Sequence, residues 1–211
     1  MTAKYPFIHR FEPGSRSDAP PLLLLHGTGG DENDLLQLGA MISPGSSLLS
    51  PRGRALENGK PRFFRRLAEG VFDEEDVRRR ALELGDFVRE ARGRYGISAP
   101  IAVGYSNGAN IAAALLLMSP EALARAILLR AMVPLTEPPA ADLEQRPVLI
   151  LSGRQDPIVP ADNADTLAEM LSAAGGKVNH RILPAGHQLS QEDIALSREW
   201  VVEMKHESAG Q

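Results

Sequence analysis

One short unit in the middle of the chain constrains the fold more than any other feature. An apolar run at 101–104 leads into Gly104-Tyr105-Ser106-Asn107-Gly108, and an almost wholly apolar stretch then continues to Met118. A helix that is apolar on every face is usually buried. A buried helix that directly follows a strand is typical of a parallel sheet covered by helices. The unit therefore predicts an α/β fold with the helix 107–118 packed inside it.

The same alternation of apolar runs and amphipathic stretches extends along the chain. Two segments, 53–73 and 134–147, lack clear periodicity and are expected to be loops on one side of the sheet. The sequence predicts a single α/β domain over 1–211, with a mostly parallel central sheet, helices on both faces and a polar, frayed tail at about 205–211. The expected strands are 22–26, 47–50, 101–104, 126–129, 148–151 and 177–183, and the expected helices are 31–41, 75–95, 107–118, 162–174 and 191–204.

Composition excludes several classes of function. A net charge of −4 gives no basic excess for a polyanion, so nucleic acid is not an expected partner. The chain has no cysteine, which excludes disulfides, thiolate metal sites and a cysteine nucleophile. Its apolar runs are far shorter than the roughly 20 residues of a membrane span, and residues 1–10 lack the apolar core of a secretory signal. We therefore expect a cytoplasmic protein without a membrane span.

The turn at 104–108 matches the pattern G-x-S-x-G. In its strand–turn–helix setting this pattern places the serine on a sharp turn with its hydroxyl exposed. Glycine at 104 and 108 avoids the clashes that a Cβ would make there, and the helix N-terminus behind Ser106 favours developing negative charge. Ser106 is thus the expected nucleophile. The alternative is that Ser106 only caps the helix on a glycine-bounded turn.

A serine hydroxyl needs a neighbouring base to become a good nucleophile. Among five histidines, His187 is chosen because it follows the last expected strand, at the same sheet edge as Ser106. Asp156 directly follows the strand 148–151 at that edge and is expected to orient His187. The order Ser, Asp, His along the chain is that of α/β-hydrolases. The alternatives are a turn-forming Asp156 and a solvent-facing His187.

An oxyanion hole requires two backbone N–H donors aimed at one oxygen. Asn107, directly after the serine, is expected to supply one donor. Thr28 in the loop His26-Gly27-Thr28-Gly29-Gly30 is expected to supply the other, with Gly29 as the second choice. The chain lacks the Lys-Ser/Thr ending of a P-loop and has no G-x-G-x-x-G, which argues against nucleotide binding. It has no H-E-x-x-H pair either, so no metal and no cofactor are expected.

Taken together, these motifs resemble the phospholipase/carboxylesterase family of α/β-hydrolases over about residues 5–200. The segments that carry the resemblance are 25–32, 104–110, 153–160 and Gly186-His187, while 51–53 and 61–66 are similar to a branch of small bacterial hydrolases linked to quinone or metal stress. The resemblance implies an α/β-hydrolase fold without a large lid domain, acting on esters or thioesters with short to medium acyl chains. It carries the triad role to Ser106, Asp156 and His187, and the oxyanion role to Thr28 and Asn107.

One residue departs from the family pattern. Relatives such as acyl-protein thioesterases usually have Gln after the serine, where this chain has Asn107. A backbone donor is unaffected by that change, so the expected mechanism stands, whereas activity on lipidated proteins is not expected.

The loops that flank the expected triad also supply candidates for the substrate pocket. Apolar walls suit a small uncharged ester. Phe63 and Phe64 could instead pin their loop to the core, and Arg62, Arg65 and Arg66 could either attract an anionic substrate or form a solvated charge run. The substrate-binding candidates are Met132, Val133, Ile158, Val159, Leu189, Phe63, Phe64, Val71 and Phe72.

The sequence therefore predicts a serine carboxylesterase whose partner is a small-molecule ester, and it leaves a homodimer open. The competing hypotheses are a thioesterase or lysophospholipase-like hydrolase, hydrolysis of peptide or C–C bonds by the same triad, and a small-molecule binding protein with little turnover.

Overall fold

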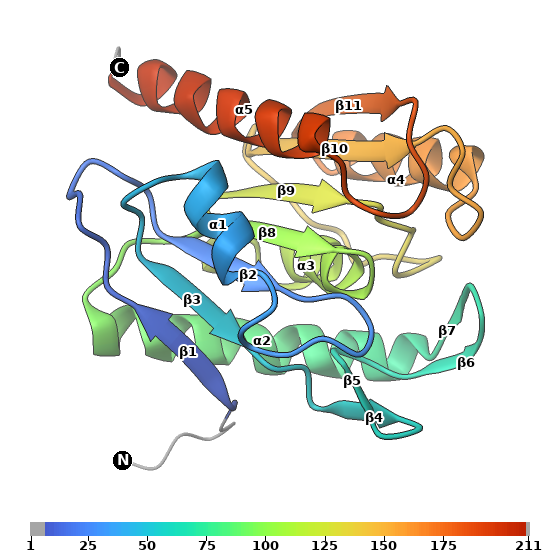
Figure 1. Cartoon of the computed structure of the whole chain (residues 1–211). Helices are drawn as coiled ribbons and strands as arrows, with labels where there is room; N and C mark the ends of the chain where they lie inside the picture. Colours follow the sequence, from blue (N-terminus) through green and yellow to red (C-terminus); the bar gives the residue numbers. More distant parts are fainter. Residues whose placement is uncertain (1–6, 210–211) are drawn as a thin grey trace.

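The computed structural model describes residues 7–209, and the core of this part of the chain is a seven-stranded sheet. The spatial order is β1-β3-β2-β8-β9-β10-β11, and every pair is parallel except β1 with β3 (Figure 1). This arrangement confirms the mostly parallel sheet predicted from the sequence. The strands are β1 (His9–Glu12), β2 (Leu22–Leu25), β3 (Leu48–Pro51), β8 (Ile101–Tyr105), β9 (Arg125–Leu129), β10 (Pro147–Gly153) and β11 (Lys177–Leu183).

Helices cover both faces of the sheet. Successive side chains of a strand point to opposite faces, so Leu22 and Leu24 pack with α1 and α5, whereas Leu23 and Leu25 pack with α2 and α3. Figure 1 shows α1 and α5 in front of the sheet and the other three helices behind it. The helices are α1 (Leu36–Ile42), α2 (Glu74–Tyr95), α3 (Asn107–Met118), α4 (Ala161–Ala173) and α5 (Gln191–Ala209), with a short 3₁₀ turn at Pro120–Ala122.

Three sequence expectations need correction. The helix expected at 31–41 begins only at Leu36, because 32–35 form turns. The helix expected at 191–204 continues to Ala209, and fraying of the polar tail stays a prediction. Residues 210–211, and residues 1–6 of the segment judged to lack a secretory signal, lie outside the described residues.

The third correction concerns the segment 53–73, which forms two β-hairpins rather than an irregular loop. The first pairs β4 (Ala55–Glu57) with β5 (Lys60–Arg62), and the second pairs β6 (Arg66–Ala68) with β7 (Val71–Phe72). Asn58 and Gly59 turn the first hairpin with φ of 51° and 76°, the conformation for which Asn-Gly is preferred. The segment 134–146 contains no helix or strand, as predicted.

Backbone hydrogen bonds connect the strands at the edge where the expected site residues lie. The residue that follows β8, β9 or β10 donates its N–H to a carbonyl near the end of the next strand in the sheet. We call this set of bonds the edge ladder. Its members are Ser106 N to Leu129 O at 2.9 Å, Arg130 N to Leu151 O at 2.9 Å and Arg154 N to Leu183 O at 2.8 Å.

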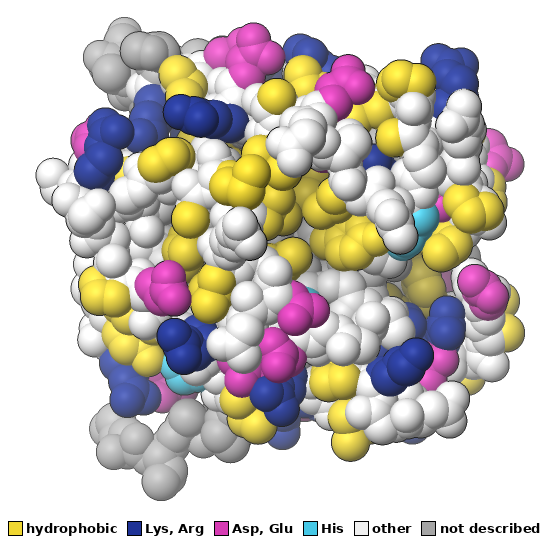
Figure 2. Space-filling model, viewed as in Figure 1, with side chains coloured by type: hydrophobic (Ala, Val, Ile, Leu, Met, Phe, Trp, Pro, Cys, Tyr) yellow, Lys and Arg dark blue, Asp and Glu magenta, His cyan; other side chains and the backbone are white. Residues whose placement is uncertain are grey.

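Charges of both signs are interspersed over the face drawn in Figure 2, without a large patch of one sign. Within residues 7–209, no helix combines the length and the apolar character that crossing a bilayer would require.

Candidate active site

The turn between β8 and α3 has the geometry of a nucleophile elbow. Ser106 has φ 52° and ψ −115°, a region that costs a non-glycine residue energy and clusters at functional sites. A Cβ on Gly104 would lie 2.5 Å from the carbonyl oxygen of Gly108, and a Cβ on Gly108 would overlap the backbone of Leu25. Ser106 stands at the N-terminus of α3 but its side chain makes no capping hydrogen bond. The helix-capping alternative is therefore wrong.

A line of hydrogen bonds connects Ser106, His187 and Asp156. The Nε2 atom of His187 lies 3.0 Å from Ser106 Oγ, and its Nδ1 atom lies 2.8 Å from Asp156 Oδ2. A carboxylate facing Nδ1 favours the tautomer with the proton on Nδ1, which leaves Nε2 free to accept from the hydroxyl. The other carboxylate oxygen accepts from the N–H groups of Ile158 and Val159 at 2.8 and 3.0 Å, which fixes its orientation. Loops after β8, β10 and β11 thus meet at one sheet edge.

A buried arginine holds the loop that carries His187. The guanidinium of Arg130 donates to the carbonyls of Gly186 and Gln188, on either side of the histidine, at 2.8 and 3.3 Å. It also forms a bidentate ion pair with Asp193 at 2.7 and 2.9 Å, and both side chains are fully buried. Sequence reasoning missed Arg130, although an arginine directly after the apolar run 126–129 was a signal.

A second Ser–His–Asp line exists elsewhere and serves as a comparison. Ser152 Oγ lies 2.9 Å from His180 Nε2, and His180 Nδ1 lies 3.3 Å from Asp165. Ser152 is buried within β10, and none of the three residues lines the cavity beside Ser106. The same residue types therefore occur twice, and of the two lines it is the one through Ser106 that lines this cavity.

Two backbone N–H groups beside Ser106 have no hydrogen-bond partner among residues 7–209, those of Thr28 and Asn107. Both residues line the cavity. The second choice, Gly29, is already engaged, since its N–H donates to Pro61 O at 2.8 Å. The geometry thus favours Thr28 over Gly29 as an oxyanion donor.

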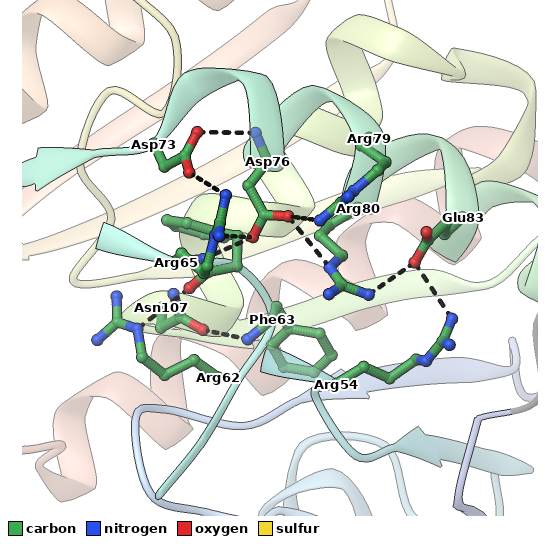
Figure 3. Close-up of polar contacts among 11 residues, drawn as sticks. Arg54, Arg62, Phe63, Arg65, Asp73, Asp76, Arg79, Arg80, Glu83 and Asn107 are labelled. Atoms are coloured by element: carbon green, nitrogen blue, oxygen red, sulfur yellow. Dashed lines mark hydrogen bonds and ion pairs between the residues drawn. The ribbon is translucent and has the colours of Figure 1, made fainter. Parts of the chain in front are cut away.

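The hairpin β4–β5 and Phe63, which directly follows it, contact both residues of this pair. Asn107 Oδ1 accepts from the backbone N–H of Phe63 at 2.7 Å (Figure 3), and Arg62 Nη1 donates to Thr28 Oγ1 at 2.7 Å. A third bond, from Arg65 N to Asp76 Oδ2 at 2.8 Å, attaches the same segment to the first turn of α2. The segment 61–65 is therefore hydrogen-bonded to three other parts of the chain, at Thr28, Asn107 and Asp76.

His26, at the end of β2, connects the loop 27–30 to the strand end at 51–53. Its Nε2 accepts from Gly53 N at 2.9 Å, so its Nδ1 carries the proton and donates to Gly27 O at 2.7 Å. Both ring nitrogens are thus used by the neutral imidazole, and burial lowers the pKa of His26.

The cavity beside Ser106 has a volume of about 330 Å³. Its lining includes three of the predicted substrate-binding candidates, Met132, Ile158 and Phe72. The rest of the lining is largely polar, and within it Glu69, Tyr105 and Asn110 had no predicted role. The full lining is Thr28, Arg62, Arg66, Glu69, Gly70, Phe72, Tyr105, Ser106, Asn107, Asn110, Met132, Ile158 and His187.

The other pocket candidates lie elsewhere. Phe63 and Phe64 are buried in the core under α2 and α3, so the alternative that they pin their segment to the core describes them better. Val71 lines a neighbouring cavity, and Leu189 packs with the core between the sheet and α5. Arg62 is buried at 3 % exposure, which corrects the picture of a wholly solvated charge run, whereas Arg65 is 63 % exposed.

Comparison with known proteins agrees with this geometry. The model of the phospholipase/carboxylesterase family matches residues 8–202. The chain belongs to this family. A relative, "Putative hydrolase MhqD" of Bacillus subtilis (strain 168), is 46 % identical over 202 residues, which cover 92 % of this chain and 98 % of that protein.

Two solved structures of carboxylesterases are also similar. The one from Bacillus cereus is 44 % identical with a TM-score of 0.90, over 93 % of this chain and 94 % of that one. The one from Mesorhizobium loti is 34 % identical with a TM-score of 0.88, over 93 % and 94 % of the two chains. The fold is therefore that of an α/β-hydrolase, and the chain is a hydrolase of the carboxylesterase type.

Proposed function

We propose that the chain is a serine carboxylesterase that hydrolyses short- to medium-chain esters through an acyl-enzyme on Ser106. The observation that carries the proposal is the line from Asp156 through His187 to Ser106, which ends in a cavity. Membership in the carboxylesterase family supports the same reaction type.

In the acylation step, Ser106 Oγ attacks the ester carbonyl carbon while its proton passes to His187 Nε2. Asp156 stabilises the imidazolium through Nδ1 and keeps the ring oriented. The backbone N–H groups of Thr28 and Asn107 receive the oxyanion of the tetrahedral intermediate. The C–O bond then breaks, and the alcohol departs with the proton that His187 returns.

Deacylation reverses these roles with water. His187 Nε2 takes a proton from a water molecule as its oxygen attacks the acyl carbon, and the same N–H groups receive the second oxyanion. Collapse of that intermediate releases the carboxylic acid and returns the proton to Ser106 Oγ. No cofactor or metal takes part in either step.

The size and walls of the cavity support a small substrate. About 330 Å³ lies near the lower end of the range for ligand pockets, roughly 300–1,000 Å³. Met132, Phe72 and Ile158 give it apolar surface on which a short acyl chain can pack.

The experiment that tests this function compares two serine variants. Ser106→Ala is expected to abolish turnover of p-nitrophenyl acetate and butyrate and labelling by a fluorophosphonate probe. Ser152→Ala, in the second Ser–His–Asp line, is the matched control and is expected to keep both. Labelling of Ser106 without turnover of any ester in a graded series would favour the binding-protein hypothesis. Full activity in Ser106→Ala would disprove the mechanism.

Three finer expectations from the sequence remain proposals. Esters are proposed over thioesters, the location is proposed to be cytoplasmic, and a homodimer stays a prediction that the oligomeric state in solution will test.

A further inference from the structure

Two arginines stand in the wall of the catalytic cavity, and the proposed mechanism uses neither of them. Arg62 and Arg66 both line the cavity that contains Ser106 and His187. Arg62 is 3 % exposed and belongs to β5, and Arg66 begins β6. A buried arginine is costly unless its charge is compensated, so the pair needs a physical account.

The structure supplies only part of that compensation. Both guanidinium groups share one carboxylate, Glu57, at 3.3 Å from Arg62 Nε and 2.8 Å from Arg66 Nη2. Burial and the neighbouring charge of Arg66 lower the pKa of Arg62, while Glu57 opposes that shift. Glu69, which lines the cavity, is exposed to solvent, where its interactions are screened. One positive charge in the wall is therefore left without a close partner.

The hydrogen-bonding capacity of Arg62 leads to the same conclusion. Its Nε donates to Phe64 O at 3.2 Å and its Nη1 to Thr28 Oγ1 at 2.7 Å. Its Nη2 has no hydrogen-bond partner among residues 7–209, yet it is not sealed from solvent. An arginine with an unused N–H at the wall of a cavity is suited to donate hydrogen bonds to a bound carboxylate, since its planar guanidinium matches carboxylate geometry.

The segment that carries Arg62 is also fixed in place. The backbone carbonyl of Pro61 accepts from Gly29 N, and the backbone N–H groups of Phe63 and Arg65 donate to the side chains of Asn107 and Asp76. A cation held this firmly loses little freedom when it binds an anion, so more of the interaction energy appears as selectivity.

We propose that Arg62 and Arg66 select esters that carry a free carboxylate, such as half-esters of small dicarboxylic acids. This inference rests on the serine esterase proposed above and names the substrate class of the same site. The expected selectivity is about tenfold or more in kcat/KM over a neutral substrate of the same shape, the range for hydrogen bonds to charged groups.

The test uses pairs of esters in which an isopropyl group replaces the carboxylate. Monoethyl succinate against ethyl 4-methylpentanoate probes the acyl side, and acetoxyacetate against isobutyl acetate probes the alcohol side. Proton release gives kcat/KM for each ester, and the ratio within a pair is the readout. We expect the carboxylate to be preferred in at least one pair.

Variants then separate charge recognition from a structural role. Arg66→Gln is expected to lower the ratio by roughly tenfold. Arg62→Gln is expected to lower the ratio and also kcat/KM for both esters of the pair, because Arg62 also contacts Thr28. Glu69→Gln is expected to raise the ratio. Arg65→Gln is the matched control, since Arg65 is exposed and outside the cavity wall, and it is expected to leave the ratio unchanged.

The outcomes distinguish this proposal from the one it rests on. If the neutral esters are hydrolysed and the ratio of kcat/KM, carboxylate ester over neutral ester, is at or below one in both pairs, charge selection is overturned and the serine esterase stands. The same holds if Arg66→Gln leaves that ratio unchanged. Activity on p-nitrophenyl acetate but on none of the four esters also overturns charge selection. No turnover of any ester together with no labelling of Ser106 overturns the serine esterase itself.

Discussion

At the scale of single residues, Arg130 shows how a charge inside the protein can serve the site without contacting substrate. It directly follows β9 with a φ of 57°, in the left-handed region, and its side chain reaches the carbonyls beside His187. Its ion pair with Asp193 is fully buried. A buried ion pair is itself weak evidence of stability, but breaking one leaves an uncompensated charge.

Arg130→Met is therefore expected to lower the free energy of unfolding by about 3–5 kcal/mol, because Asp193 then remains buried without its partner. Urea denaturation at pH 7 measures the loss. Arg130→Lys keeps the charge but not the planar fork, and is expected to fall between wild type and Arg130→Met. A loss below about 1 kcal/mol in Arg130→Met would show that the pair is not needed for stability.

Sequence reasoning located the three residues of the proposed triad but not their supports. Ser106, Asp156 and His187 each follow a strand, and parallel strands bring their ends to one edge, so position alone brought them together. Arg130 was missed, and the burial of Arg62 was not foreseen, because the sequence does not tell which charged residues are buried. Their contacts, Asp193 and Thr28, are far away along the chain.

At the scale of elements, the hairpin β4–β5 acts as a clamp on the proposed oxyanion hole. It contacts the loop 27–30 through Pro61 and Arg62 and the elbow through Phe63. The side chain of Asn107 thus has a use beyond its backbone donor. It joins the elbow to the hairpin, which gives a physical reason for asparagine at this position.

Asn107→Ala is expected to destabilise the protein by about 1–3 kcal/mol, because the buried N–H of Phe63 loses its acceptor. It is also expected to lower kcat more than it raises KM, because the backbone donor at 107 becomes less firmly placed. Urea denaturation and ester kinetics measure the two effects. A variant with wild-type stability and kcat would show that the clamp does not position the hole.

The same hairpins mark the limit of element prediction. The longer strands and helices were predicted because apolar runs such as 148–151 or 107–118 are unambiguous. The strands of 53–73 have only two or three residues each, too few to show a period of two. Asn58-Gly59 was a recognisable hairpin signal, but the flanking strands gave it no support.

At the scale of the whole molecule, the buried His26 and the half-buried His180 couple folding to pH. Burial is the main cause that lowers the pKa of both His26 and His180 from the ordinary value of 6.5. The unfolded chain therefore binds more protons than the folded one below about pH 6.5, so stability falls as the pH drops.

We expect the free energy of unfolding, measured by urea denaturation, to decrease between pH 7.5 and pH 5.5. His26→Gln removes one of the two groups and is expected to make this decrease smaller, whatever its effect on stability at pH 7.5. The pH range stays above the ordinary pKa values of aspartate and glutamate, roughly 4. An unchanged slope in His26→Gln would mean that His26 does not contribute.

The edge ladder has a consequence for how this chain can tolerate change. Because Ser106, Arg130 and Arg154 each bond one strand end to the next strand from β8 to β11, a slip of one strand would shift the serine, the arginine support and the aspartate relative to one another. Insertions in the connection 134–146 leave the hydrogen bonds of the edge ladder intact, whereas one residue added inside β9 or β10 would break them. Length variation among active homologues should therefore collect in the connections and spare the strand ends.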